Sequence, residues 1–179
     1  TITNNLIYIG EGAFSGCTTL KNVDIQGQLE WMYSQAFYNC TSLEEITLPN
    51  SKVKYEDYTF YKCTSLKTVK LGKDSYIETL SASMFEDTIV DTFIVDSNSP
   101  YYSTSSDNAF LLSKDGKELV LAAVSYDYPE VLVLDYDVIC QGAFSGVKNL
   151  KEVEFSKSTT IIEEYAFANC SSITTLTLP

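Results

Sequence analysis

The stretch Ala36-Phe-Tyr-Asn-Cys-Thr-Ser-Leu-Glu-Glu-Ile-Thr-Leu-Pro49 decides the fold, because a close copy of it occurs at Ala166-Phe-Ala-Asn-Cys-Ser-Ser-Ile-Thr-Thr-Leu-Thr-Leu-Pro179. Its most constant residue is a phenylalanine that recurs along the chain, at Phe14, Phe37, Phe60, Phe85, Phe144 and Phe167. The step from Phe14 to Phe37, and again from Phe144 to Phe167, is 23 residues. A fixed period of this length indicates a solenoid, in which each repeat buries its apolar face against its neighbours.

A strand pattern follows each phenylalanine. A cysteine lies three residues after it in four copies, at Cys17, Cys40, Cys63 and Cys170. Apolar residues then come three, six and eight positions later, and their final alternation has the period of a half-buried strand. The copy at Met84–Thr88 fits only with one residue deleted, which places Phe93 in the strand. Because the cysteines share one position in the repeat, we expect a column of free thiols.

A second apolar column lies five residues before each phenylalanine. Its members are Ile9, Met32, Tyr55, Leu80, Ile139 and Ile162. We predict that each repeat consists of this inward anchor, a short helical turn that carries the Phe, and a strand. The strands of successive repeats should pair in parallel. The expected fold is therefore an α/β repeat solenoid with a parallel β-sheet on one face and short helical turns and loops on the other.

The two quoted stretches resemble the BspA-type leucine-rich repeat, in which the cysteine comes before the strand. The resemblance covers essentially the whole chain. It implies a leucine-rich-repeat-like, right-handed array of about six 23-residue units. It also implies a surface-displayed or secreted bacterial protein, hence an extracellular or cell-surface location, and a role in adhesion to extracellular matrix or to other cells.

The repeat is interrupted between residues 96 and 135, since 59 residues separate Phe85 from Phe144. Within the interruption, Ala109–Leu112 and Leu119–Ala123 flank Asp115-Gly116, which is typical of a β-hairpin. Such an island also resembles those found inside BspA-type arrays.

We therefore predict a single domain over residues 1–179, with repeats at 1–95 and 136–179 and the island at 96–135. We expect this domain to be a fragment of a longer array, whose cut ends or edges could self-associate.

Composition argues against several classes of function. The net charge of −12 is unfavourable for nucleic acid, whose phosphates require a basic surface. No apolar run is long enough to insert into a membrane. The chain has no histidine, no Cys-x-x-Cys and no glycine-rich phosphate loop. The sequence therefore lacks the residues of the usual His-containing catalytic triads, of Cys/His metal sites and of phosphate-binding loops. We predict no enzymatic activity, no metal and no cofactor.

Candidate partner-binding residues fall into three groups. The outward row of the strands contains Asp24, Thr47, Lys70 and Glu154, which carry mixed charge and no aromatic anchor. The island and its exit contain Tyr101, Tyr102, Tyr126 and Tyr128, whose rings could bind a partner or simply cover the flank of the solenoid. Trp31 shares a column with Tyr8 and Lys54, and we expect it to be partly exposed.

These features favour a non-catalytic interaction or adhesion module that binds an extracellular protein or matrix component, or a glycan. Two alternatives stay open at this point. The array could be a passive structural spacer, or it could be an accessory module for a domain outside these residues.

Overall fold

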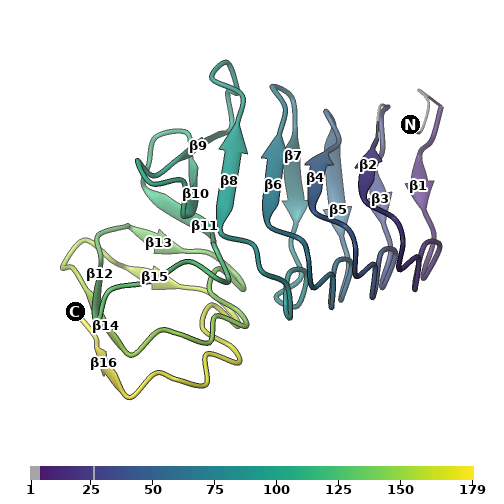
Figure 1. Ribbon diagram of the computed structural model, residues 1–179. Helices are drawn as coiled ribbons and strands as arrows, with labels where there is room; N and C mark the ends of the chain where they lie inside the picture. Colours follow the sequence, from purple (N-terminus) through teal and green to yellow (C-terminus); the bar gives the residue numbers. More distant parts are fainter. Residues whose placement is uncertain (1–4, 26) are drawn as a thin grey trace.

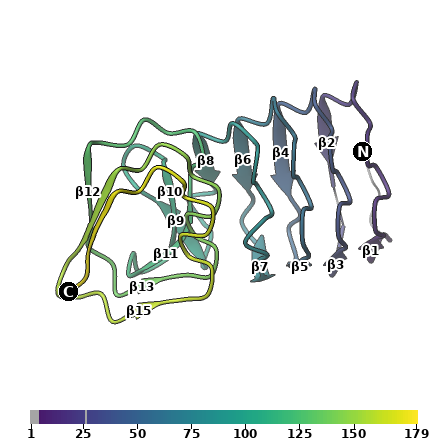
Figure 2. The same cartoon turned by 90° about the horizontal axis from the view of Figure 1, so that it is seen from below.

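The computed structural model describes residues 5–25 and 27–179, which form two stacks of short strands joined at a corner (Figure 1). In Figure 2 the first stack is seen from the side while the second is seen along its length, so the stacking direction turns at the corner. The predicted solenoid of parallel strands is confirmed. The described residues contain no helix, and therefore no helix that could cross a membrane.

The first stack has two parallel sheets. One consists of β2 (Asn22–Asp24), β4 (Glu45–Leu48), β6 (Thr68–Leu71) and β8 (Thr92–Val95). The other consists of β1 (Tyr8–Ile9), β3 (Trp31–Met32), β5 (Lys52–Tyr55) and β7 (Tyr76–Thr79). In the first of these sheets Val69 is in register with Ile46 on one side and Phe93 on the other. This register confirms the predicted strands, including the copy with one residue deleted.

The prediction of helical turns and loops opposite the parallel sheet is wrong, because five of the six upstream anchors, all except Leu80, also lie in strands. Ile9, Met32 and Tyr55 are buried, whereas Tyr8 points to solvent and Lys54 is half-buried. An inward residue next to outward ones is the alternation of a strand. Strands of two to four residues are too short to show this period clearly in the sequence.

The predicted helical turns around the phenylalanines are also wrong. The amide of Phe14 donates to the carbonyl oxygen of Ala36 in the next repeat (2.8 Å), not to a residue four positions earlier in its own repeat. Two residues in five of these turns, such as Gln35 (φ 59°) and Asn39 (φ 58°), and Asp87 alone in the turn of Phe85, adopt left-handed conformations. These residues break the helical path and turn alternate amides toward the neighbouring repeat.

The predicted phenylalanine column is confirmed as the centre of the core. In the first stack the ring of Phe37 stacks on Phe14 (5.1 Å between centroids) and on Phe60 (5.5 Å). In the second stack Phe144 and Phe167 stack at 4.8 Å. Parallel displaced rings are a favourable aromatic geometry, and each ring also removes about 150 to 250 Å² from water.

The cysteine that lies three residues after the phenylalanine has a defined structural role. The Cys40 thiol donates to the carbonyl oxygen of Phe14 (3.1 Å), and the Cys63 thiol donates to that of Phe37 (3.1 Å). Cys170 repeats the contact with Phe144 (3.0 Å). Each thiol therefore satisfies a carbonyl of the preceding repeat while it packs as a small apolar group.

The second stack also has two sheets. One is parallel and consists of β12 (Val131–Leu134), β14 (Glu152–Phe155) and β16 (Thr175–Thr177). The other is mixed and consists of β9 (Tyr102–Thr104), β10 (Phe110–Ser113), β11 (Glu118–Ala122), β13 (Val138–Ile139) and β15 (Ile161–Ile162). Strand β12 lies within residues 96–135 and pairs in parallel with β14, so regular pairing resumes before residue 136.

The predicted hairpin is confirmed. Strands β10 and β11 are antiparallel, and their turn includes Gly116, whose φ of 74° suits glycine. Strand β9 extends the hairpin to three strands, and β11 pairs in parallel with β13. The hairpin is therefore the first layer of the second stack.

The hairpin separates two hydrophobic cores and contributes to both. Leu111 and Leu121 are buried in the core of the first stack, whereas Phe110 and Leu112 are buried in the core of the second. The ring of Phe110 meets Phe144 edge-on, with 5.9 Å between centroids. The island thus closes one stack and starts the next.

Candidate partner-binding surface

The predicted outward row lies on solvent-facing positions, as its spacing required. Asp24, Thr47 and Lys70 are in register across β2, β4 and β6, and Glu154 occupies the matching position on β14. The Lys70 ammonium forms an ion pair with Glu45 (2.7 Å). We call the outward side of sheet β2–β4–β6–β8 the polar face. It carries polar and charged side chains, together with the exposed aliphatic residue Ile94, which was not predicted as an outward residue from the sequence.

The four island tyrosines separate into buried and accessible rings. Tyr102 and Tyr128 are only 6% and 7% exposed. The Tyr102 hydroxyl accepts a hydrogen bond from the amide of Ile77 (3.1 Å). Burial raises the pKa of Tyr102 to about 12. These two rings therefore belong to the cores and are not available to a partner. This agrees with the alternative that the island tyrosines cover the flank of the solenoid.

The other two island tyrosines reach the surface. Tyr101 is exposed. Tyr126 is half-buried, donates to Asp107 (3.0 Å), and packs against both cores. Tyr126 thus has a structural partner, whereas Tyr101 stays a candidate contact.

Trp31 lies on an aromatic surface that extends along sheet β1–β3–β5–β7. Its ring stacks on Tyr33 at 5.6 Å, and Tyr33 meets Tyr8 edge-on at 6.0 Å. The Lys54 ammonium lies 4.4 Å from the centre of the Trp31 ring, which is a cation–π contact. We call the outward side chains of this sheet, together with Tyr33, the aromatic face.

The aromatic face continues toward the corner between the stacks. Tyr76 on β7 meets Tyr101 edge-on at 4.9 Å, and the Lys52 ammonium lies 5.8 Å from the Tyr76 ring. Lys52 also pairs with Glu78 (3.1 Å). The surface therefore alternates rings with charged groups, and most of these groups already contact one another.

The sequence placed Trp31 in one column with Tyr8 and Lys54, but it did not indicate Tyr33 and Tyr76 as further members of the aromatic face. The signal was present, because Tyr8 immediately precedes the buried anchor Ile9, and Trp31 and Tyr33 flank the anchor Met32. Residues next to an inward position in a strand must point outward. With the anchors placed outside any strand, these rings had no predicted direction.

A pocket of about 310 Å³ lies where the aromatic face meets the second stack. We call it the corner pocket. Tyr76 and Glu78 line it from β7, Tyr101 from the island, Glu118 from β11, and Glu163 from the segment after β15. Elements far apart in the sequence supply these residues, because the change in stacking direction brings residues of β7, β11 and the segment after β15 around one pocket.

The corner pocket is electrostatically negative. Its three glutamates carry formal negative charge at neutral pH, and among the described residues only Glu78 of the three forms an ion pair within 4 Å. Cys140 also lines the pocket, and the pKa of its thiol is affected by these surroundings. Burial, together with the charges of Glu163 and Glu118, raises the pKa of the Cys140 thiol to about 12.

The sequence over residues 1–113 and 132–179 matches the BspA type leucine-rich repeat region, with six copies. The chain belongs to this BspA-type family. The unmatched residues contain β11, the strand on which the array changes direction. No curated protein matches the sequence significantly.

Two solved structures resemble this BspA-type chain. A leucine-rich repeat protein from Eubacterium ventriosum aligns with a TM-score of 0.64 and 16% identity, over 98% of this chain and 58% of that protein. The pneumococcal vaccine antigen PcpA aligns with a TM-score of 0.54 and 15% identity, over 97% of this chain and 56% of that protein. The chain thus spans a little over half the length of each. These likenesses support the fold.

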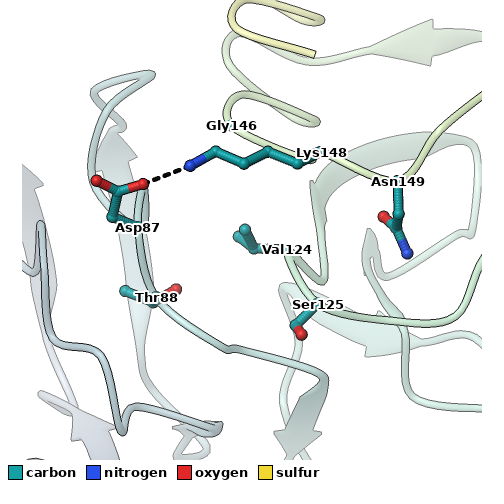
Figure 3. A pocket seen from close by; sticks show the side chains of 7 residues that line it. All are labelled: Asp87, Thr88, Val124, Ser125, Gly146, Lys148 and Asn149. Carbon is teal, nitrogen blue, oxygen red and sulfur yellow. Dashed lines mark hydrogen bonds and ion pairs between the residues drawn. The ribbon is translucent and has the colours of Figure 1, made fainter. Parts of the chain in front are cut away.

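A second hollow, of about 260 Å³, lies between the stacks of this BspA-type array (Figure 3). The Lys148 ammonium reaches across it to Asp87 (2.6 Å), as the dashed line in Figure 3 shows. Nearby, Asn169 donates to Glu86 (3.2 Å). These contacts join the last turn of the first stack to the turns of the second, so the hollow belongs to the structural junction.

The described residues contain no cluster of three or more histidine, cysteine or acidic side chains that could hold a metal ion. The surfaces described above present aromatic contact area, ammonium groups and carboxylates. The aromatic face and the adjoining corner pocket combine all three.

Proposed function

We propose that the chain is a non-catalytic interaction module of a bacterial cell-surface or secreted protein, and that its partner binds the aromatic face. The observation that carries this proposal is the ordered group of Trp31, Tyr33, Tyr8 and Lys54 on an exposed sheet. Tryptophan and tyrosine dominate the energetics of protein interfaces. Contacts among these side chains fix them before binding, which lowers the entropic cost of association.

The geometry favours a protein partner, such as an extracellular matrix component, over a glycan. A sugar ring would stack on an open aromatic face, but the Lys54 ammonium covers one face of the Trp31 indole. Tyr8 is 61% exposed and lies at the far end of the group from the corner pocket. A flat surface of fixed rings and charges suits the side chains of another protein.

The test is binding of the purified chain to immobilised extracellular matrix proteins, followed by variants of each face. For a matrix protein that binds, Trp31→Ala/Tyr33→Ala should weaken binding by about 30-fold or more, the loss expected when a hot spot of about 2 kcal/mol is truncated. The matched control on the polar face, Thr47→Ala/Lys70→Ala, should change binding by less than about threefold.

Thermal unfolding of both variants distinguishes loss of a contact from loss of the fold. If the polar-face variant loses binding and the aromatic-face variant retains it, the assignment of the surface is wrong. If no matrix protein, cell surface or glycan binds the wild-type chain, the spacer interpretation replaces the interaction module.

A further inference from the structure

We propose that the corner pocket accepts a lysine or arginine side chain of the protein that binds the aromatic face. This inference rests on the proposed function, because Tyr76 belongs to both the aromatic face and the pocket wall. A partner lying along β3, β5 and β7 would reach the pocket at the end of the sheet. The inference adds the chemistry of one anchoring residue to the proposed interface.

The walls of the pocket supply the two kinds of group that bind an ammonium or guanidinium ion. The rings of Tyr76 and Tyr101 meet edge-on at 4.9 Å and line the same pocket. A cation over an aromatic ring is attracted to its negative face. Glu118 and Glu163 add carboxylates from the opposite stack, and a carboxylate forms charge-assisted hydrogen bonds with either cation.

The chain itself contains a lysine in this arrangement at the edge of the pocket. The Lys52 ammonium lies 5.8 Å from the centre of the Tyr76 ring and 3.1 Å from the Glu78 carboxylate. Tyr101, Glu118 and Glu163 add a ring and two carboxylates to the lining of the same pocket, where Glu163 also accepts the amide of Gln141 (2.8 Å). Among the described residues, no lysine lies within 4 Å of the Glu118 or Glu163 carboxylates.

Size and charge favour a single cationic side chain as the occupant. The volume of about 310 Å³ is at the lower limit of ligand pockets, which range over about 300 to 1,000 Å³, and suits one side chain better than an extended oligosaccharide. Cys140, Glu118 and Glu163 line the same pocket, and the pKa of the Cys140 thiol is raised by burial first and by the charges of the two glutamates second. A neutral side chain would leave the charges of the glutamates uncompensated, whereas a cation would offset them.

The experiment uses the whole isotope-labelled chain and a blocked peptide with one arginine between glycines. A second peptide carries citrulline, which has nearly the same shape as arginine and no charge. We expect the arginine peptide to shift the amide NMR signals of Tyr101, Glu118 and Gln141. The citrulline peptide should bind at least about fivefold more weakly, because it loses both the cation–π and the ionic contribution.

Two matched double variants locate the binding. Glu118→Gln/Glu163→Gln should abolish the shifts at the pocket, and Glu152→Gln/Glu154→Gln, which removes the same charge from sheet β12–β14–β16, should leave them unchanged. Equal binding of both peptides, equal loss in both variants, or no shift at the pocket residues would each overturn the inference. A free amine or amino sugar that binds while the arginine peptide does not would also overturn it.

The outcome is separable from that of the proposed function. If Trp31→Ala/Tyr33→Ala loses the matrix protein while Glu118→Gln/Glu163→Gln keeps wild-type affinity for it, the proposed function stands and the pocket inference fails. If the arginine peptide binds the pocket but the Trp31 variant still binds the matrix protein, the aromatic face is the part that fails.

Discussion

The two outer faces of the first stack are attached to the same core yet differ in what they present. On the polar face the outward residues are Asp24, Thr47 and Lys70, whereas on the aromatic face Trp31 and Tyr33 pack with lysine and tyrosine. The inward residues of both faces meet around the stacked phenylalanine rings. The repeat therefore determines the core, and the two faces differ at the outward positions that the repeat leaves variable.

The faces also differ in where they end. Sheet β2–β4–β6–β8 ends at β8, with exposed Ile94 in the outward row. The aromatic face runs from β1 to β7 and ends at the corner pocket, where the second stack adds Glu118 and Glu163. The sheet of the polar face also meets the island, since the amide of Phe93 on β8 donates to the carbonyl oxygen of Asn108 (2.9 Å), but the corner pocket adjoins the aromatic face.

The largest expected effect comes from the core shared by both faces. Phe37→Ala should lower the free energy of unfolding by about 3 to 5 kcal/mol, because its fully buried ring stacks on both neighbours. Thr47→Ala, on the polar face, should be neutral within about 0.5 kcal/mol. Chemical denaturation of the two variants measures the difference, and equal tolerance of both changes would show that the inward and outward assignments are wrong.

The core could be predicted from the sequence because its signal is periodic. Phe37, Cys40 and the strand residues recur at fixed spacing, so the register followed from counting, even across the copy in which Phe93 required a deletion. The aromatic face could not be predicted in full. Its residues share a direction only if the anchors lie in strands, and strands of two residues leave too short a pattern.

The structure of the turns and of the island could not be predicted from the sequence, because the residues that they contact are distant in sequence. Ala-Phe followed by cysteine at the third position resembles one turn of a helix, but the Phe14 amide bonds to Ala36 in the next repeat. The continuous apolar run Ala109-Phe-Leu-Leu112 is typical of a strand that is buried on both sides. Which cores bury it depends on the corner, and that requires the whole fold.

A smaller effect should arise at the corner where the two stacks meet. A Cβ on Gly142 would lie 2.5 Å from the Cα of Ala82. The φ of Gly142 is 64°, which lies in the left-handed region. Gly142→Ala should cost about 2 to 4 kcal/mol, from overpacking added to backbone strain.

Gly16→Ala is the matched control for Gly142→Ala. It has a similar φ of 72° but no heavy atom within 4 Å of an added Cβ, so it should cost only about 1 to 2 kcal/mol. Thermal unfolding compares the two. Equal costs would mean that the close approach of the stacks at Gly142 contributes nothing to stability.

The smallest expected effect is the response of the corner to acid. The Lys148 ammonium beside Asp87 holds the pKa of that carboxyl below its usual range. A depressed pKa in the folded state gives stability that is present above about pH 4 and is lost as the pH falls through the folded value. The pair is partly exposed, so the loss should be below about 1 kcal/mol.

Lys148→Met removes the cause of the depressed Asp87 pKa and should reduce this acid-dependent loss. Unfolding free energies measured between pH 6 and pH 3 for the wild type and the variant provide the comparison. Identical pH profiles would show that the ion pair does not couple the stacks.

The most direct test of the central claim is a side-chain footprint on the two faces of the first stack. Hydroxyl-radical oxidation of the whole chain, alone and bound to a matrix protein, reports the accessibility of Tyr8, Trp31 and Tyr33 on one face and of Ile94 on the other. We expect binding to protect the three aromatic residues and to leave the oxidation of Ile94 unchanged. Protection of Ile94 with unchanged oxidation of Trp31 would contradict this expectation.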